Sequence, residues 1–463
     1  MIGESFQAQG GERLVNIFIA GGGRVGFHLA RLLSLENHNI TVIETEQDRL
    51  EQIDTALDVS TKIGSAASVL GLREAGAASA DLFVSVTGND EVNLVAAATA
   101  KALGAKRTVA RVDQPTYVDS SMLYETMLGI DFVLSPEALT AQEIIKYIEN
   151  PGVVATEDFG RGLIHMRQIR VTDSPTKGRK TIEDVIPPGS GMGVLVGVIS
   201  RNGEVMIPHG DDRVKPGDLV TLIGHREQMP EVIKLFQGKE PKPRKVLVVG
   251  GSSIGLHLAQ GLENRPLSVK LLDRNMKQCN GLATLLKKTA IVCRDGTSRE
   301  DLLKERVEDA DVFVATTDDD ERNIMACVLA KSIGAAQTIA VVHQPDFAPL
   351  VPKLGIDHAV TPRACIANRI LKLVHQDRVS SLAVLEEGQV EILELAVTGD
   401  APILGKTLRD IRPIFPRGAL IATILRGEKV IVPTGDDEVH ADDSMVVIAA
   451  ADSLDAVQKL FHP

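Results

Sequence analysis

Tryptophan is absent from the 463 residues, and tyrosine occurs only three times. Proteins that bind single-stranded nucleic acids stack bases on aromatic side chains, and such platforms are scarce here. Acidic residues outnumber basic ones by 62 to 50, which gives a formal net charge of −12 at pH 7. Because DNA, RNA and anionic membrane surfaces attract clustered positive charge, this balance argues against all three. We therefore expect no nucleic acid among the partners.

Cysteines and long apolar runs are also scarce. The four cysteines form no C-x-x-C pair, which argues against a disulfide framework or a zinc site and favours a reducing cytosol. No stretch approaches the roughly 18 consecutive apolar residues of a membrane span. The first 13 residues read as a polar tail without an apolar signal region. We expect a cytoplasmic protein with no membrane insertion.

What the sequence does contain is an internal duplication. Residues 81–105 align without a gap with residues 311–335, and 12 of the 25 positions are identical. The glycine-rich turns at 21–26 and 250–255 repeat at a similar offset. A charged, proline-bearing linker at 238–244 separates the two copies. The length suggests about three domains, in a range of two to four, and an apolar share of 44% is ample for several cores.

Each copy changes character along its length. The first part alternates short Val/Ile-rich runs with helical stretches, which predicts βαβ units and a parallel sheet. In the latter part, strands flank tight turns at 201–204 and 426–429, as in β-hairpins, and a closing helix ends in Lys-Leu-Phe. We predict an α/β fold with two Rossmann-like doubly wound parallel-sheet domains, each followed by a small α+β C-terminal module.

The predicted boundaries follow from this alternation. A linking helix begins after Ser135-Pro136 and after Thr361-Pro362, where Ser or Thr caps the helix and Pro suits its first turn. The segments are a tail (1–13), the first Rossmann-like domain (14–135), a linking helix (136–155), the first C-terminal module (156–237), a linker (238–244), the second Rossmann-like domain (245–361), a second linking helix (362–388) and the second module (389–463).

The turn of copy one carries the full G-x-G-x-x-G pattern as Gly21, Gly23 and Gly26. The first glycine permits a tight turn, the second lets a pyrophosphate approach the backbone, and the third allows close helix–sheet packing. The following helix N-terminus offers N–H groups to the anion. Glu44 ends the next strand, where a carboxylate accepts both ribose hydroxyls and repels a 2′-phosphate, which favours NAD over NADP. The alternative is a glycine-rich turn without a ligand.

Two arginines are candidate phosphate contacts, because a guanidinium suits phosphate geometry. Arg24 lies inside the turn, and Arg111 ends a later strand at the carboxyl edge of the sheet, where ligands bind. For each, the alternative is a surface arginine.

Copy two repeats the glycine turn but lacks the middle glycine and both candidate phosphate-binding arginines. The replacements are Ser252 for Gly23, Ser253 for Arg24 and Val341 for Arg111. Asp273 preserves the ribose carboxylate. We expect copy two to keep the fold, to retain at most adenosine recognition, and to bind dinucleotides weakly.

A further repeated motif lies where a strand meets a helix. Thr87 with Asp90, and Thr317 with Asp320, resemble capping boxes in which Asp replaces the usual Glu or Gln. The functional alternative is a loop edge that closes over the nucleotide.

Together, these motifs and their order resemble the TrkA family of Trk potassium-uptake proteins, which carry two RCK (regulating conductance of potassium) domains in tandem. The resemblance covers residues 14 to 461. It implies a cytosolic regulatory subunit, peripheral at the cytoplasmic face of the membrane through a membrane-embedded Trk potassium-translocating partner. It also implies a homo-oligomeric ring of four chains, with NAD or NADH and ATP or ADP as ligands.

The resemblance also places a family loop at Gly64 and Ser65, where Ser65 replaces the usual acid, whereas copy two keeps the acid as Asp295 and has Arg294 in place of the glycine. The predicted nucleotide-binding residues are Gly21, Gly23, Arg24, Val25, Gly26, Glu44, Gly64, Ser65, Thr87, Arg111 and, in copy two, Asp273.

Three classes of function compete. A dehydrogenase needs a substrate domain and an acid or base beside the nicotinamide. One module has His209 at the position where the other has Thr434, and no set of catalytic side chains repeats. We therefore favour a regulatory subunit without catalytic residues or a metal site over an NAD-dependent oxidoreductase. A third reading is an interaction scaffold that binds no nucleotide.

Overall fold

The structure is a computed structural model that describes residues 15–34, 38–150, 152–172, 181–187, 191–201, 204–237, 244–375, 379–385 and 389–461. The predicted N-terminal tail, nearly all of the predicted linker and the two turn residues 202–203 lie outside the described residues. The chain forms two compact units. One consists of residues 1–148 and 243–374, and the other of residues 149–242 and 375–463.

The first unit contains two six-stranded parallel sheets, one from each copy, as the βαβ alternation predicted. The first sheet has the order β3-β2-β1-β4-β5-β6, which is that of a doubly wound fold. Its strands are β1 (Asn16–Ala20), β2 (Asn39–Glu44), β3 (Ser60–Ile63), β4 (Leu82–Ser85), β5 (Arg107–Arg111) and β6 (Phe132–Leu134). Its helices are α1 (Arg24–Ser34), α2 (Gln47–Ala56), α3 (Val69–Glu74), α4 (Asp90–Leu103), α5 (Pro115–Val118) and α6 (Ser121–Leu128).

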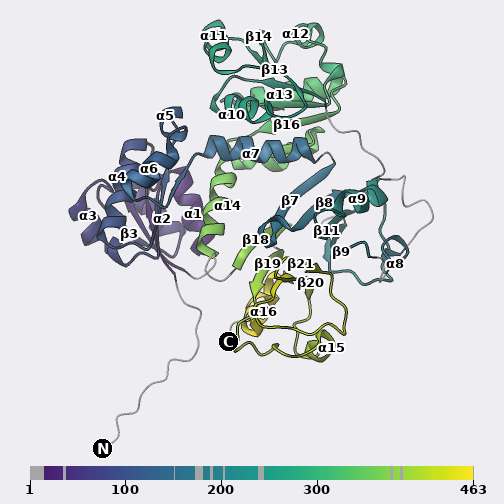
Figure 1. Cartoon of the computed structure of the whole chain (residues 1–463). Helices are drawn as coiled ribbons and strands as arrows, with labels where there is room; N and C mark the ends of the chain where they lie inside the picture. The colour runs from purple at the N-terminus through teal and green to yellow at the C-terminus, as the bar shows by residue number, and fades with distance from the viewer. Residues whose placement is uncertain are drawn as a thin grey trace, which may run out of the picture. The chain divides into compact units, whose positions relative to one another are not determined.

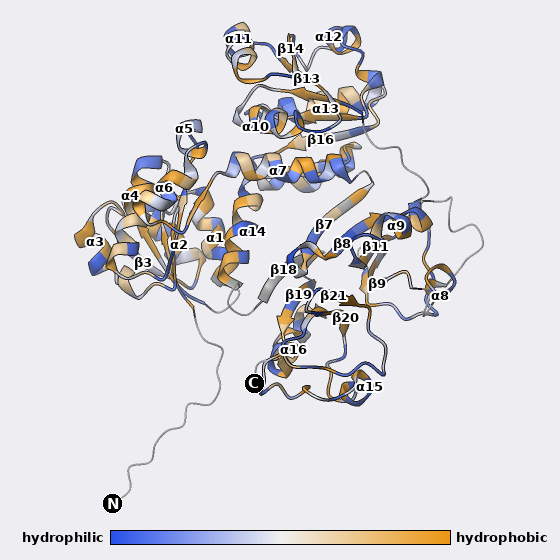
Figure 2. Cartoon of the chain, in the orientation of Figure 1, coloured by the Kyte–Doolittle hydropathy of each residue, from blue (hydrophilic) through white to orange (hydrophobic). Residues whose placement is uncertain are grey.

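The second sheet repeats this order as β14-β13-β12-β15-β16-β17. Its strands are β12 (Lys245–Val249), β13 (Ser268–Asp273), β14 (Ala290–Cys293), β15 (Val312–Ala315), β16 (Gln337–Val341) and β17 (His358–Val360). Its helices are α10 (Ser253–Leu262), α11 (Met276–Leu285), α12 (Arg299–Lys304) and α13 (Asp320–Ile333). Figure 2 shows β13 and β16 in orange among helices of mixed colour, as expected for strands that are covered on both faces.

The linking helices α7 (Pro136–Glu149) and α14 (Pro362–His375) each pack against the sheet of the other copy (Figure 1). Ile144 and Ile148 of α7 join the core of the second sheet. Ile366 and Ile370 of α14 join the core of the first. Both helices are shorter than predicted, because β7 begins at Val153 and β18 begins at Val379, each within the range expected to be helical. The two Rossmann-like domains therefore complete each other's hydrophobic cores.

The second unit contains the two C-terminal modules, each a five-stranded antiparallel sheet with a closing helix. The first has β7 (Val153–Phe159), β8 (Ile164–Arg170), α8 (Ile182–Val185), β9 (Val194–Arg201), β10 (Glu204–Met206), β11 (Leu219–His225) and α9 (Met229–Gln237). The second has β18 (Val379–Leu385), β19 (Val390–Ala396), α15 (Leu408–Ile411), β20 (Ala419–Arg426), β21 (Lys429–Ile431), β22 (Ser444–Ala450) and α16 (Leu454–Phe461). The predicted hairpins are β9–β10 and β20–β21.

One shared core joins these two modules. It includes Met166 and Ile223 from the first module and Ile392 and Ile448 from the second. A bidentate ion pair also repeats, between Arg201 and Asp218 in the first module and between the matching pair in the second. The duplication therefore extends to side-chain contacts within the modules.

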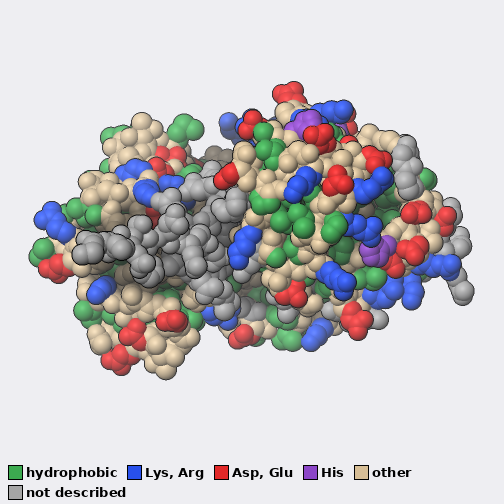
Figure 3. All heavy atoms as spheres, turned by 90° about the horizontal axis from the view of Figure 1, so that it is seen from below, with side chains coloured by type: hydrophobic (Ala, Val, Ile, Leu, Met, Phe, Trp, Pro, Cys, Tyr) green, Lys and Arg blue, Asp and Glu red, His purple; other side chains and the backbone are tan. Residues whose placement is uncertain are grey.

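Three observations bear on the expected class of protein. No helix in the described part of the chain is long and apolar enough to cross a membrane. On the face drawn in Figure 3, acidic and basic side chains are interspersed rather than gathered by sign. The four cysteines are all free thiols.

Candidate functional site

The predicted residues of copy one gather at one edge of the first sheet. The glycine turn follows β1, Glu44 ends β2, and Gly64 follows β3. Thr87 follows β4, and Arg111 ends β5. Because all these strands are parallel, their carboxyl ends meet at the same edge, which is where doubly wound sheets bind ligands.

The outer glycines of each turn are required by the fold itself. Gly21 has a φ of +109°, and a Cβ there would lie 3.0 Å from the backbone nitrogen of Thr87. A Cβ on Gly26 would lie 1.8 Å from the carbonyl oxygen of Gly21. In copy two, Gly250 has a φ of +105°, and a Cβ on Gly255 would lie 2.1 Å from the carbonyl oxygen of Gly250. Any larger residue at these positions would force the turn or the helix to move.

The middle glycine of copy one is different, because a Cβ on Gly23 would meet no atom within 4 Å. The fold therefore does not explain this glycine. Copy two has Ser252 here, whose Oγ accepts from the N–H of Gly255 at 3.3 Å and donates to the carbonyl of Thr316 at 2.5 Å. In copy one, no described residue accepts from the N–H groups of residues 24–26. These donors remain open to an external acceptor.

Glu44 is a buried, ionised carboxylate beside this turn. Its Oε2 accepts from the N–H of Gly22 at 2.7 Å, and its Oε1 accepts from the N–H of Thr45 at 2.6 Å. Burial raises the pKa of Glu44, but these hydrogen bonds outweigh that effect and hold the pKa below its ordinary value. In copy two, the Oδ2 of Asp273 accepts from the N–H of Gly251 at 2.7 Å. Both carboxylates are fixed at the carboxyl end of the second strand of their sheets.

The loop after β3 completes the edge on the other side of Glu44. The N–H of Gly64 donates to the carbonyl of Glu44 at 2.8 Å, which ties this loop to β2. The Oγ of Ser65 accepts from the N–H of Ala67 at 3.3 Å. Ser65 therefore stabilises its own turn, and the residue contributes no charge to the edge.

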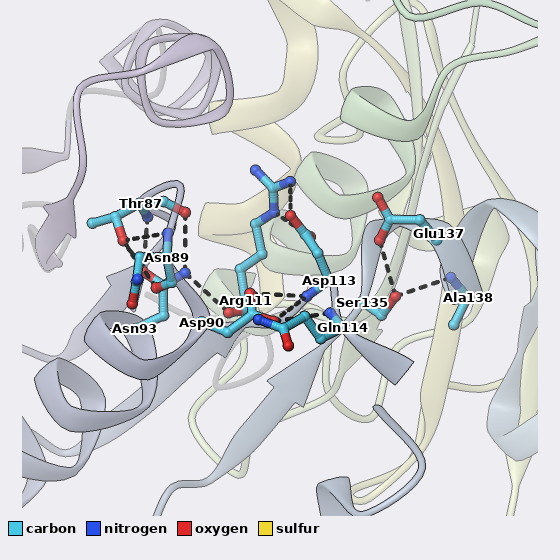
Figure 4. A network of polar contacts seen from close by, with 10 residues as sticks. All are labelled: Thr87, Asn89, Asp90, Asn93, Arg111, Asp113, Gln114, Ser135, Glu137 and Ala138. Carbon is cyan, nitrogen blue, oxygen red and sulfur yellow. Dashed lines mark hydrogen bonds and ion pairs between the residues drawn. The ribbon is translucent and has the colours of Figure 1, made fainter. Parts of the chain in front are cut away.

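The two candidate arginines have different surroundings. Arg111 forms a bidentate ion pair with Asp113, with distances of 2.9 Å from Nε to Oδ1 and 2.7 Å from Nη2 to Oδ2 (Figure 4). A phosphate would have to displace Asp113 from this pair. Arg24 is exposed, and no carboxylate of the described chain lies within ion-pair distance of it. Arg24 is thus the cation that is available without rearrangement.

The predicted capping boxes are wrong. Helix α4 is capped by Asn89, whose side chain accepts from a first-turn N–H, and α13 is capped in the same way by Asp319. Asp90 points away from the cap and accepts the N–H of Asp113 at 3.0 Å, which ties α4 to the loop after β5 (Figure 4). Thr87 and Asp90 therefore do not cap the helix together, and the capping residue of α4 lies two positions after Thr87.

A buried asparagine that the sequence analysis missed holds Thr87 in place. Asn93 accepts from the N–H of Thr87 at 2.8 Å and from its Oγ1 at 2.7 Å (Figure 4). Its amide donates to the carbonyl of Arg111 at 3.0 Å. Asn323 makes the matching contacts in copy two. The signal was the repetition of this asparagine in both copies of the aligned segment.

Copy two has a pocket of about 260 Å³ at the equivalent edge. Its lining includes Asp273 and three arginines, Arg274, Arg294 and Arg322. Asp295 pairs with Arg322 at 3.3 Å and accepts from the N–H of Thr297 at 2.9 Å. Burial raises the pKa of Asp295, but these contacts outweigh that effect and hold the pKa below its ordinary value. Asp295 and Arg294 were expected from the sequence, whereas Arg322, from the start of α13, was not.

Comparison with known proteins gives the family. The family model of the TrkA-N domain matches residues 17–136 and 246–362, and that of the TrkA-C domain matches residues 166–237 and 392–462. The Trk system potassium uptake protein TrkA homolog of Archaeoglobus fulgidus is 35% identical over 448 residues, which are 97% of this chain and 100% of that protein. The chain belongs to the TrkA family.

Solved structures show that the fold of this TrkA-family chain also occurs in a channel. The GsuK channel bound to NAD matches with a TM-score of 0.61 at 17% identity, covering 98% of this chain and 80% of that one. The crystal structure of the GsuK RCK domain matches with a TM-score of 0.60 at 19% identity, covering 98% and 96%. At these identities the likeness concerns the fold.

Proposed function

We propose that this TrkA-family chain is a cytosolic nucleotide-sensing regulatory subunit that binds NAD(H) and ATP or ADP and gates a membrane-embedded Trk potassium-translocating partner. The observation that carries the proposal is the open space around Gly23. The fold accounts for the outer glycines of both copies but not for the middle one, and an approaching ligand would account for it. Copy two fills the same position with Ser252.

The ligand chemistry follows from the donors and acceptors at this edge. The open N–H groups of residues 24–26 and the guanidinium of Arg24 suit phosphate oxygens. The ionised Glu44 suits the two ribose hydroxyls of an adenosine and repels a 2′-phosphate. These residues fit NAD(H), ATP or ADP, and they disfavour NADP(H). The GsuK channel, whose fold the chain shares, is described as bound to NAD.

The proposed partner and assembly rest on the family. Its curated members are named for the Trk potassium-uptake system. Similar units within one chain pack through pseudo-symmetric contacts, which favours closed rings, and we propose a ring of four chains at the cytoplasmic face of the membrane partner. A ligand can shift such a ring between two shapes only through unequal affinity for them.

Two measurements on the purified chain test the proposal. Calorimetric titration with NADH, NAD, ATP, ADP and NADPH should show binding, with NADPH the weakest. Incubation with NADH and candidate carbonyl substrates should leave its absorbance at 340 nm unchanged. Steady oxidation of NADH would favour the NAD-dependent oxidoreductase instead, and no binding of any nucleotide would favour an interaction scaffold.

The regulatory part needs the membrane partner. Co-purification with a Trk potassium-translocating subunit, followed by potassium flux measured in proteoliposomes, should show flux that depends on the added nucleotide. Flux that is the same with and without this chain would overturn the gating role while leaving nucleotide binding intact.

A further inference from the structure

Helix α14 carries an arginine on the face that it buries against the first sheet. Ile366, Ile370 and Val374 of this helix belong to the core of the first sheet. Arg363 precedes Ile366 by three residues and Ile370 by seven, which is the spacing of one helix face. The first turn of α14 therefore directs Arg363 toward copy one, although the residue belongs to copy two.

The element that Arg363 approaches is the start of α1. Val25 and Phe27, on either side of Gly26 at the start of α1, pack against the same core cluster as Ile366 and Ile370. At the far end of α14, Arg107 of copy one donates to the carbonyl of Leu373 at 2.6 Å. The helix is thus fixed to copy one at both ends.

Electrostatic effects agree with this placement. Burial and the Arg24 guanidinium lower the pKa of Arg363, and the Asp346 carboxylate opposes them. Burial lowers the pKa of His28, one turn further along α1, and Arg31 and Arg363 lower it further. Arg363 donates one hydrogen bond, to the carbonyl of His343 at 3.4 Å. Within the described residues, no carboxylate lies within ion-pair distance of either Arg24 or Arg363.

Arg24 and Arg363 repel each other, and Asp346 offsets this repulsion only from beyond ion-pair distance. An anion bound beside both guanidinium groups would remove the remaining cost. The open N–H groups of residues 24–26 belong to the same first turn of α1 as Arg24. We propose that Arg363 is a phosphate ligand of the copy-one nucleotide site, supplied by the linking helix of copy two. This rests on the proposed function, because it requires that copy one binds a nucleotide.

The matching helix brings the opposite charge to copy two. Glu137 occupies in α7 the position of Arg363 in α14, and its spacing from Ala141, Ile144 and Ile148 places it on the face that packs against the second sheet. Burial and the nearby Asp113 raise the pKa of Glu137. The position that carries a cation in α14 therefore carries a carboxyl group in α7. The preference of phosphate for copy one then has two sources, the turn itself and the helix that crosses to it.

The test uses the full-length chain and calorimetric titration with ADP, ATP and adenosine. Arg363→Ala should weaken ADP and ATP roughly tenfold or more, as expected for loss of a charge-assisted hydrogen bond, and should leave adenosine unchanged. Arg363→Glu, which copies Glu137, should weaken them further, and Arg363→Lys should restore part of the affinity. Arg369→Ala is the matched control, because Arg369 is exposed on the same helix.

The outcomes separate the two levels of the proposal. If the unaltered chain binds neither ADP nor ATP, the proposed function fails. If it binds them and the Arg363→Ala and Arg363→Glu variants bind equally well, Arg363 is not a ligand and the proposed function stands. Equal losses for ADP and adenosine, with a lowered melting temperature, would assign Arg363 a structural role in docking α14 and would also overturn the proposal.

Discussion

A Gly23→Ser substitution separates ligand binding from folding at the copy-one turn. A Cβ at this position meets nothing within 4 Å, so the new side chain costs no packing energy. In copy two, the Ser252 hydroxyl caps the N–H of Gly255. We expect the new hydroxyl in copy one to cap the N–H of Gly26 in the same way. Because Ser exceeds Gly as an N-cap by only a few tenths of a kcal/mol, we expect the melting temperature to stay the same or rise slightly.

The nucleotide should respond in the opposite way. The capped N–H is no longer free for phosphate, and the side chain stands where phosphate approaches. A hydrogen bond to a charged group contributes about 1.5–3 kcal/mol, which corresponds to a loss of about 10- to 150-fold in affinity for ADP or NADH. Isothermal titration calorimetry measures this loss, and thermal unfolding followed by circular dichroism measures stability on the same sample.

The reverse change in copy two, Ser252→Gly, is the matched control. It should lower stability by a few tenths of a kcal/mol and leave the affinity of copy one unchanged. Unaltered affinity and stoichiometry in Gly23→Ser would refute the argument that copy one is the dominant site. A large fall in melting temperature would refute the argument that the fold leaves this position free.

Three further outcomes can be checked. Gly26→Ala should destabilise the chain by about 1–3 kcal/mol or more in urea unfolding, since its Cβ would lie 1.8 Å from a carbonyl oxygen; stability equal to that of Gly23→Ala would contradict this. Glu44→Gln should narrow the preference for NADH over NADPH in competition titrations, because it removes the charge that repels a 2′-phosphate; an unchanged ratio would show that Glu44 does not set it. Burial lowers the pKa of His358 from its ordinary 6.5 to about 4; Asp357 opposes this shift and Lys331 adds to it. The contribution of His358 to the free energy of unfolding is therefore constant above pH 6.5 and falls as the pH drops toward 4. His358→Gln should therefore reduce the fall in melting temperature between pH 7 and pH 5, and an identical fall would exclude this histidine as a source.

Most of the sheet architecture follows from local sequence signals. Val/Ile-rich runs and the glycine turns mark β1 and β12 together with the helices that follow them, because strand burial and turn geometry are local requirements. The partner of a linking helix is not a local property. The apolar face of α14 shows that the helix is buried, but its spacing cannot say which of two similar sheets covers it. The exchange of α7 and α14 is therefore visible only in three dimensions.

The errors at the strand–helix junctions have a similar origin. Thr87 and Asn89 are both good capping residues, two positions apart, and local propensity does not choose between them. The choice is made by Asn93, which binds the hydroxyl and the N–H of Thr87 and so removes that threonine from the cap. Likewise, Arg322 and Asp295 meet only because the helix after β15 and the loop after β14 share one edge of the sheet.

The exchange of α7 and α14 also orders events during synthesis. The first Rossmann-like domain emerges from the ribosome with the face that α14 covers still bare, and this face stays exposed until Pro362 and the residues after it have been translated. The core of the second sheet can be covered as soon as that sheet is synthesised, because α7 precedes it in the chain. A gene cut at the boundary between the copies would therefore yield two fragments, each carrying a helix that belongs to the other. Such fragments can reach the native cores only by recombining, either with each other or as exchanged pairs of the same half.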